Sequence, residues 1–279
     1  MFEQIEPSFK DIWREVINNR FNFNEPLPDR PEYLFEIEDG EDSYGIALPG
    51  SVIEFSGKPK ARKSSLMAGF AAACLAKDKK ALNIRSKIEG KVLWIDTEQS
   101  RLEFSYFQRM LVRMAGLDRH PDNYIALNIR KYDDNTRFEI VNHAITRNPD
   151  LGLIIIDGIA DLSMDENEQN STKALVSRLM YWADSIACPI LIAIHTNKDG
   201  KESTGHLGGY IDKRCSYHIR VEKNSEESPS LVYPKLSRMG EKFPKFYFAH
   251  EQGGLPRILD QSVIGDMEGD NSEYSVLPF

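Results

Sequence analysis

The sequence predicts a doubly wound α/β fold with a mostly parallel sheet, to which antiparallel strands are added at the C-terminal side. Between residues 51 and 195, short apolar segments alternate with segments of helical periodicity, a pattern typical of a parallel sheet covered by helices. Two of these segments, 152–156 and 189–195, are continuously apolar, as expected for strands buried on both faces. Beyond residue 200 the pattern gives strands without intervening helices, which indicates antiparallel strands that extend the sheet.

The expected elements follow in chain order. A first helix at 8–21 is predicted because large apolar residues recur at helical spacing, and Ser8 with Asp11 resembles a capping box. Three prolines between residues 26 and 31 then impose an extended linker. The helix would pack on its own domain or on a neighbouring subunit. We expect strands at 51–56, 91–96, 123–129, 152–156, 189–195, 216–223, 230–238 and 245–250, and helices at 64–77, 101–115, 136–147 and 171–186.

This pattern divides the chain into three parts: a helix with a Pro-rich linker (1–32), one large α/β domain (33–250) and a tail rich in Gly, Asp, Glu and Ser (251–279). No apolar run approaches the roughly 20 residues of a membrane helix, and the acidic N-terminus lacks the features of a signal peptide. Three cysteines without C-x-x-C spacing predict reduced core thiols in a cytoplasmic protein. The net charge of −8 argues against nonspecific coating of nucleic acid, although it leaves room for a local basic channel.

A phosphate-binding loop is the strongest motif. Residues 57–64 match G-x-x-x-x-G-K-[ST] except that Arg62 replaces the second glycine. The loop lies between an expected strand and an expected helix, so its N–H groups can cradle phosphates while Lys63 reaches the β- and γ-phosphates and Ser64 binds Mg²⁺. The alternative is a solvated basic turn, which Arg62 favours because glycine permits backbone angles that a side chain resists. The nucleotide-binding prediction covers Gly57, Lys58, Pro59, Lys60, Ala61, Arg62, Lys63, Ser64 and Ser65.

Polar residues end three of the expected parallel strands, at the sheet edge where open α/β folds bind nucleotides. Asp157 can hold Mg²⁺ through water, or it simply ends a strand. Glu98 can orient and deprotonate an attacking water, whereas Asp96 and Glu98 could also be acids that favour a helix start. His195 can contact the γ-phosphate and relay its loss, with a structural role equally open. We expect Glu98 to be the base, and metal binding by His195 is disfavoured because no other histidine has ligand spacing with it.

The order of these motifs resembles RecA-type ATPases and, within them, the RepA-like hexameric helicase group. Gly205–Gly209 and Ser237-Arg238 resemble AAA-type ATPases carried on bacterial plasmids and mobilisable elements. In those relatives the loop often reads Gly-Lys-x-Lys-x-Arg-Lys-[Ser/Thr], so Arg62 matches the pattern of the subgroup. The resemblance, which covers roughly residues 30–250, implies a RecA-like fold and Mg²⁺-dependent ATP hydrolysis. It also implies a ring such as a hexamer, in which a basic finger from the neighbour completes each site. Arg214 is our candidate finger, with Lys213 and Arg238 as alternatives, and each of the three could equally be a surface ion-pair partner.

A role on DNA is less evident from the residues. The resemblance places two loops at a central channel, but the first, 163–170, is acidic and would repel phosphates. The second, 198–203, balances two lysines with two acids, and neither loop interleaves aromatic with basic residues. Two functions therefore stay open. One is a DNA-dependent ATPase of helicase type that binds single-stranded DNA in plasmid or mobile-element replication or mobilisation. The other is a regulatory ATPase that acts on a protein partner without unwinding DNA.

Overall fold

The structure is a computed structural model that describes residues 9–22, 24, 26, 32–163, 169–197, 202–225, 227–238, 240–251 and 254–260. It divides into two units, Met1–Glu32 and Tyr33–Phe279. In the first unit, α1 (Phe9–Asn18) carries four large apolar residues that are about half exposed: Ile12, Trp13, Val16 and Ile17. The capping box expected at Ser8 lies outside the described residues. Among the described residues, no helix combines the length and apolar content needed to cross a membrane.

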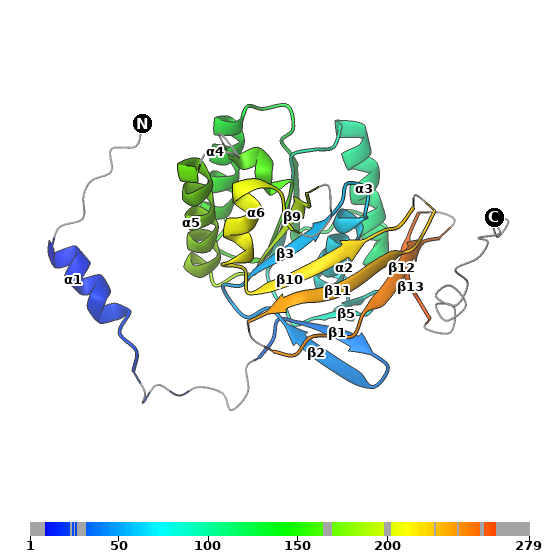
Figure 1. Ribbon diagram of the computed structural model, residues 1–279, viewed down its shortest axis with the longest axis horizontal. Helices are drawn as coiled ribbons and strands as arrows, with labels where there is room; N and C mark the ends of the chain where they lie inside the picture. Colours follow the sequence, from blue (N-terminus) through cyan, green and yellow to red (C-terminus); the bar gives the residue numbers. More distant parts are fainter. Residues whose placement is uncertain are drawn as a thin grey trace. The chain divides into compact units, whose positions relative to one another are not determined.

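The second unit is built on a nine-stranded sheet, counted over the described residues, in the order β13-β12-β11-β10-β3-β9-β8-β6-β7. Figure 1 shows β3, β10 and β11 side by side within it. The strands from β10 to β7 pair in parallel, and β11, β12 and β13 add to β10 in antiparallel fashion. The predicted fold class is therefore confirmed. The strands are β3 (Val52–Gly57), β6 (Lys91–Asp96), β7 (Tyr124–Asn128), β8 (Leu151–Asp157), β9 (Ile190–His195), β10 (Tyr217–Glu222), β11 (Ser230–Ser237), β12 (Phe246–His250) and β13 (Pro256–Leu259).

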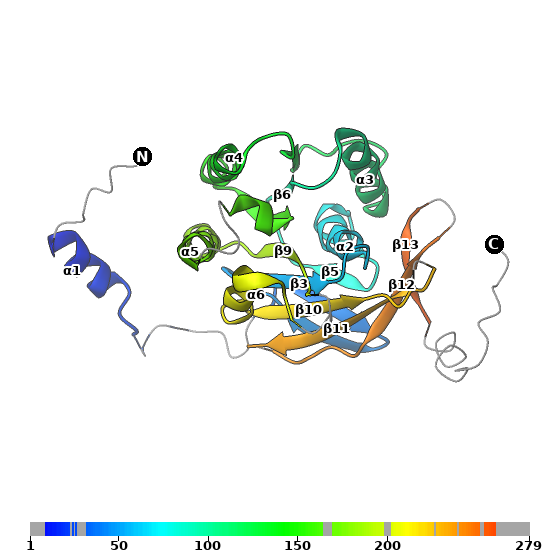
Figure 2. The same cartoon turned by 45° about the horizontal axis from the view of Figure 1, so that its top comes forward.

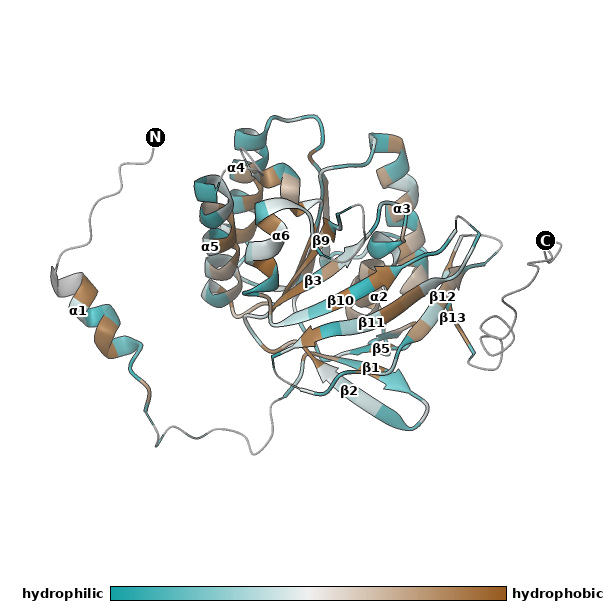
Figure 3. Cartoon of the chain, viewed as in Figure 1, coloured by the Kyte–Doolittle hydropathy of each residue, from teal (hydrophilic) through white to brown (hydrophobic). Residues whose placement is uncertain are grey.

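Helices cover both faces of this sheet. Figure 2 shows α2 (Lys63–Leu75) and α3 (Arg101–Met114) on one side, and α4 (Asp134–Thr146), α5 (Gln169–Ser185) and α6 (Gly205–Asp212) on the other. Each face has its own apolar cluster, because successive side chains of a strand point to opposite faces. In Figure 3 the strands between the helices are mostly hydrophobic, whereas polar residues gather on the outer helix surfaces. A short 3₁₀ helix, η1 (Ile159–Leu162), follows β8.

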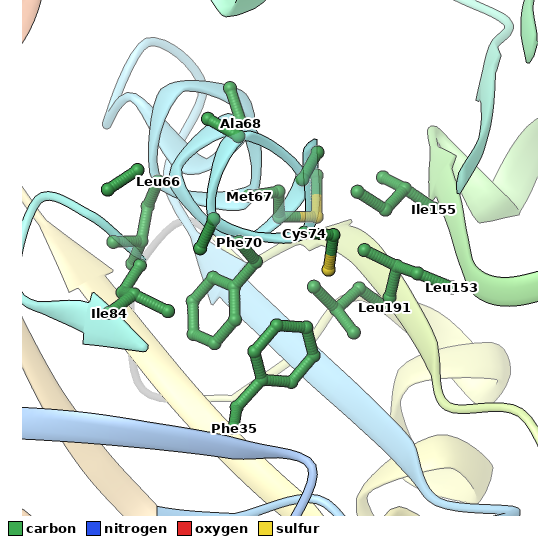
Figure 4. Packing of buried hydrophobic residues seen from close by; sticks show 14 of the residues in the cluster. Phe35, Leu66, Met67, Ala68, Phe70, Cys74, Ile84, Leu153, Ile155 and Leu191 are labelled. Atoms are coloured by element: carbon green, nitrogen blue, oxygen red, sulfur yellow. The ribbon is translucent and has the colours of Figure 1, made fainter. Parts of the chain in front are cut away.

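A smaller sheet, in the order β2-β1-β5-β4, also packs on α2. Phe70 of α2 makes an edge-to-face contact with Phe35 of β1, at a centroid distance of 5.0 Å (Figure 4). A second edge-to-face contact joins Phe70 to Phe55 of β3, at 5.4 Å. Because α2 contacts both sheets, nearly all its residues are buried, and this explains why it is apolar all round. The strands are β1 (Phe35–Asp39), β2 (Asp42–Ile46), β4 (Lys80–Ala81) and β5 (Ile84–Ser86).

The prediction that the region beyond residue 200 contains strands without intervening helices is wrong. Helix α6 forms there, and its sequence hides it because two internal glycines weaken helical propensity. Gly208 is required by close packing, since a Cβ atom there would lie 2.5 Å from the backbone of Ser203. Strand β13 falls in the segment from residue 251 that we expected to be a tail, where it pairs with β12.

Candidate nucleotide-binding site

The phosphate loop connects the end of β3 at Gly57 to the start of α2 at Lys63. Arg62 precedes the helix in the left-handed conformation, with φ at 71° and ψ at 31°, which is the geometry that makes glycine the usual residue here. An L-residue in this region costs roughly 1–2 kcal/mol. The Arg62 side chain offsets part of this cost because its Nη1 donates a hydrogen bond to the carbonyl of Ser228, 3.2 Å away. The side chain that breaks the motif thus ties the loop to the turn between β10 and β11.

Lys63 lies inside the loop and is only 6% exposed. Its Nζ donates to the carbonyl oxygens of Gly57, at 3.0 Å, and Lys58, at 3.2 Å. Burial lowers the pKa of this amine to about 8, although the nearby carboxylates of Asp157 and Glu98 counteract the shift. A phosphate oxygen would restore a strong charge-assisted partner to the ammonium.

Ser64 and Asp157 supply oxygen donors at the other side of the loop. Burial raises the pKa of Asp157 to about 7, and the hydrogen bond from the Ser64 hydroxyl opposes that shift. Burial likewise raises the pKa of Asp96 to about 6, and the Oδ2 atom of Asp96 is buried without a hydrogen-bond partner. A hydroxyl and two carboxylates, one with an unsatisfied oxygen, form the all-oxygen donor set that Mg²⁺ prefers. The residues therefore fit Mg²⁺, with Ser64 and Asp157 as the residues that would hold it.

His195 lies between Lys63 and Glu98. Its Nδ1 is 3.1 Å from Lys63 Nζ, and its Nε2 is 3.5 Å from Glu98 Oε1. An ammonium only donates hydrogen bonds, so Nδ1 accepts and the ring proton belongs on Nε2, which faces the carboxylate. The hydrogen bond with His195 lowers the pKa of Glu98, which keeps the carboxylate ionised and able to accept a proton. The structure thus joins the three residues that the sequence analysis placed on separate elements.

The segment after β6 is fixed by the end of β8. The Thr97 hydroxyl donates to the carbonyls of Asp157, at 3.1 Å, and Gly158, at 3.0 Å. Gly158 has φ at 97°, and a Cβ atom there would lie 2.1 Å from Thr97 Oγ1, so only glycine permits this close approach. Thr97 and Gly158 therefore hold Glu98 beside Asp157.

These groups surround a cavity of about 240 Å³. Phe107 of α3 contributes an aromatic side chain that sequence reasoning had no ground to select, because in the pattern it is one more apolar residue of a helix. The predicted residues Gly57 and Lys58 face a neighbouring hollow instead. The cavity is lined by Lys60, Arg62, Lys63, Ser64, Ser65, Glu98, Gln99, Phe107, Asp157, Ala193, Ile194 and His195.

Arg214 does not line this cavity. It follows α6, and its guanidinium lies over the ring of Tyr210, 5.6 Å from the centroid. The alternative Arg238 donates to the carbonyl of Cys215, at 2.9 Å, and to that of Lys213. The basic candidates for a finger therefore cluster after α6, away from the phosphate loop of their own chain. Most of the two loops expected at a channel, residues 164–168 and 198–201, lies outside the described residues.

A buried polar network that the sequence did not reveal joins α6, β10 and β3. The His218 Nδ1 is 2.7 Å from Asp212 Oδ1, its Nε2 is 2.5 Å from Ser56 Oγ, and Arg220 Nη1 donates to that hydroxyl at 2.9 Å. Glu54, fully buried next to His218, accepts a hydrogen bond from Ser203. The sequence contains one indication of this network, namely that Glu54 and Ser56 interrupt an otherwise apolar strand.

Ligand atoms of Glu54, Asp212 and His218 lie within 4.8 Å of one another, a spacing that would suit a metal ion. However, both nitrogens of His218 already have partners, and Lys235 Nζ lies 3.6 Å from Asp212 Oδ2. Burial raises the pKa of Glu54 to about 8, and the neighbouring Asp212 charge adds to the shift. A neutral Glu54 and the Lys235–Asp212 pair balance the charge without a cation, so the network is structural.

The parallel sheet, the phosphate loop and the acidic strand ends define the class of this protein, a P-loop ATPase with a RecA-like fold. Comparison with known proteins agrees. A family model described as "AAA domain" matches residues 41–201, and the chain belongs to that family. The crystal structure of the RadB recombinase is similar in fold, with a TM-score of 0.52 over 77% of this chain and 94% of that chain at 13% identity. No curated protein matches the sequence.

Proposed function

We propose that this chain is a Mg²⁺-dependent, ATP-hydrolysing motor of helicase type that assembles into a ring and acts with single-stranded DNA in plasmid or mobile-element replication or mobilisation. The observation that carries ATP hydrolysis is the line of contacts Lys63–His195–Glu98, which joins the phosphate-binding ammonium to an ionised carboxylate. The DNA and mobile-element parts are supported by the sequence resemblance to plasmid-borne ATPases of the RepA-like group.

The proposed roles follow from where each side chain lies. Lys63 binds the β- and γ-phosphates, and the loop N–H groups at the start of α2 cradle the same oxygens. Glu98 orients a water and accepts its proton during attack on the γ-phosphate. Bound Mg²⁺, held by Ser64 and Asp157, would neutralise developing charge on the phosphates. His195 contacts both Lys63 and Glu98, so loss of the γ-phosphate changes its partners and is passed to the segment that follows β9.

A neighbouring subunit is proposed to complete the site with Arg214, because a cation beside the γ-phosphate stabilises the charge that develops in the transition state. The position of Arg214 supports this role, because the residue is exposed just after α6 and does not line the nucleotide cavity of its own chain. Lys213 and Arg238 lie close enough to be alternatives.

The alternative function, a regulatory ATPase that acts on a protein partner, is favoured by the acidic character of residues 163–170, which would repel a phosphate backbone. Steady-state ATP hydrolysis measured with and without single-stranded DNA separates the two. Stimulation by DNA supports the motor, whereas hydrolysis that DNA leaves unchanged supports the regulatory ATPase. Absence of any ATP binding by the purified chain would refute both.

A further inference from the structure

A second, larger hollow of about 730 Å³ lies at the carboxyl ends of β6 and β7, next to the start of α3. Of its lining residues three are cations and none is acidic, so the surface has a local positive charge despite the net charge of −8. Two acids close in sequence, Glu103 in the capping box of α3 and Asp133 at the start of α4, have their pKa lowered by capping hydrogen bonds and stay charged, but neither lines the hollow. The lining residues are Ser100, Arg101, Asn128, Arg130, Lys131 and Tyr132.

An aromatic ring lies among these cations. Tyr132 is 38% exposed, and the Lys131 ammonium lies 4.8 Å from its ring centroid. Cations that follow a phosphate backbone, combined with a ring on which a base can stack, form the usual platform for a single strand. Residues 130–132 read Arg-Lys-Tyr, so basic residues stand directly beside an aromatic one, a combination that the loops 163–170 and 198–203 lack.

Asn128 connects this hollow to the nucleotide cavity. Its Nδ2 donates to the carbonyl of Gln99, at 2.9 Å, and to Asp96 Oδ1, at 3.3 Å, and the same carboxylate oxygen accepts from the Gln99 N–H at 2.8 Å. Gln99 and Glu98 line the nucleotide cavity. A single peptide segment therefore separates the two hollows, and one amide side chain holds it in place.

We propose that the hollow lined by Arg101, Arg130, Lys131 and Tyr132 binds a segment of single-stranded nucleic acid and, through Asn128, reports its presence to Glu98. Phosphates contact the three cations and one base stacks on Tyr132. A base edge within reach of Asn128 competes for its amide group and weakens the hydrogen bond from Asn128 to the Gln99 carbonyl. The segment that carries Gln99 can then move, and with it the carboxylate of the preceding residue, Glu98. This inference rests on the proposed DNA-dependent ATPase and gives it a DNA site outside the loops 163–170 and 198–203.

The residues that line the hollow favour single-stranded nucleic acid over a small anion such as free phosphate. A free phosphate would use the cations alone, whereas a polynucleotide engages several cations at once and also stacks a base on the Tyr132 ring. Salt dependence reports this difference. The logarithm of the binding constant falls linearly with the logarithm of the salt concentration. Removing one cation that neutralises a phosphate of single-stranded DNA makes this dependence less steep, by about 0.7 in slope. Removing the ring should instead lower affinity about ten-fold without changing that slope.

The test uses the full chain and a fluorescein-labelled oligothymidylate of about 15 nucleotides, with binding followed by anisotropy at several salt concentrations. The double variant Arg130→Ala/Lys131→Ala should bind ten-fold or more weakly, with a salt slope lower by about 1.4. Tyr132→Ala should bind more weakly at unchanged slope. Arg119→Ala removes one exposed cation beyond the far end of α3 and serves as the matched control; its affinity should equal that of the unaltered chain.

The same proteins are then assayed for ATP binding and for hydrolysis with the oligonucleotide. Intact ATP binding without oligonucleotide stimulation in the double variant supports the proposal, and Asn128→Ala should bind the oligonucleotide yet respond less to it. Full stimulation of the double variant, or an equal decrease in Arg119→Ala, overturns the proposal. Binding of polyglutamate without binding of the oligonucleotide would overturn it too, by assigning the hollow to an acidic protein segment. Failure of ATP binding in the unaltered chain would instead count against the proposed function.

Discussion

Glu54 offers the sharpest test of the buried network, since its carboxyl group should stay protonated at neutral pH. The side chain is fully buried, one oxygen accepts from Ser203, and the other has no hydrogen-bond partner. Burial, followed by the negative charge of Asp212, raises its pKa from 4.5 to about 8. A neutral acid is the form such a site tolerates, because an ionised group with an unpaired oxygen would lose its hydration without compensation.

The sign of the effect on stability follows from proton binding. Between pH 4.5 and about 8 the folded chain holds a proton on Glu54 that the unfolded chain has released, so the free energy of unfolding falls as pH rises through this window. His218, whose pKa burial lowers from 6.5, works in the opposite direction but only below about pH 6.5. From pH 6.5 to 8 the Glu54 contribution alone amounts to about 2 kcal/mol, at about 1.4 kcal/mol per pH unit.

Glu54→Gln mimics the protonated acid, keeping an acceptor for Ser203 while removing the titration. The difference in unfolding free energy, variant minus unaltered chain, should therefore rise by about 2 kcal/mol between pH 6.5 and 8. Urea unfolding followed by tryptophan fluorescence measures it, because Trp94 and Trp182 are fully buried. Taking the difference removes the contributions of other shifted groups such as Asp157, which are common to both proteins.

The matched control is Glu38→Gln. Glu38 lies on the small sheet, where a hydrogen bond from Lys80 is the main cause that lowers its pKa and Arg85 adds to it, so it is ionised throughout the window. Its substitution should change stability by the same amount at pH 6.5 and at pH 8. A pH-independent difference for Glu54→Gln as well would show that Glu54 is ionised in the folded chain and refute the reasoning.

Four further outcomes are expected. Lys63→Ala should weaken ATP binding ten-fold or more, about 1.4 kcal/mol; unchanged affinity by equilibrium binding would contradict the phosphate contact. Glu98→Gln should bind ATP yet hydrolyse it slowly, and the assignment is wrong if Asp157→Asn spares turnover while Glu98→Gln lowers only affinity. Arg214→Ala should lose turnover but not affinity, and mixing it with Glu98→Gln should restore part of the activity if neighbours share the site; mixed assemblies without recovery would exclude Arg214. Arg62→Ala should unfold about 1 kcal/mol more easily than Arg62→Gly in urea, because alanine keeps the left-handed strain; equal stability would disprove that strain.

Much of the fold could be predicted from local pattern, and the exceptions have identifiable causes. Two of the parallel strands are continuous apolar runs and the others are short, largely apolar segments between helical ones, so their order along the chain was evident. The small sheet was not, because β4 and β5 are only two and three residues long, and they are held by tertiary packing of Ala81 and Ile84 in the core that α2 shares with them. Helix α6 was missed because its glycines serve packing rather than helix propensity.

The candidate site was predictable to the extent that parallel topology brings strand ends together. Asp157, Glu98 and His195 each end a strand or follow one, so their common edge follows from the fold class. That His195 contacts both Lys63 and Glu98 does not follow, because strand order decides which ends are neighbours, and β9 lies next to β3 although 132 residues separate the histidine from the lysine. Contacts of this kind depend on topology that a residue pattern does not encode.

The buried network also connects the region of Arg214 with the phosphate loop. Asp212 ends α6 only two residues before Arg214, and it contacts His218 of β10, which in turn contacts Ser56 of β3 beside the phosphate loop. Directional hydrogen bonds therefore run from Arg220 through Ser56 and His218 to Asp212. Because each member of a buried polar network depends on its partners, the turn that carries Arg214 is held in place by the strand that leads into the chain's own phosphate loop.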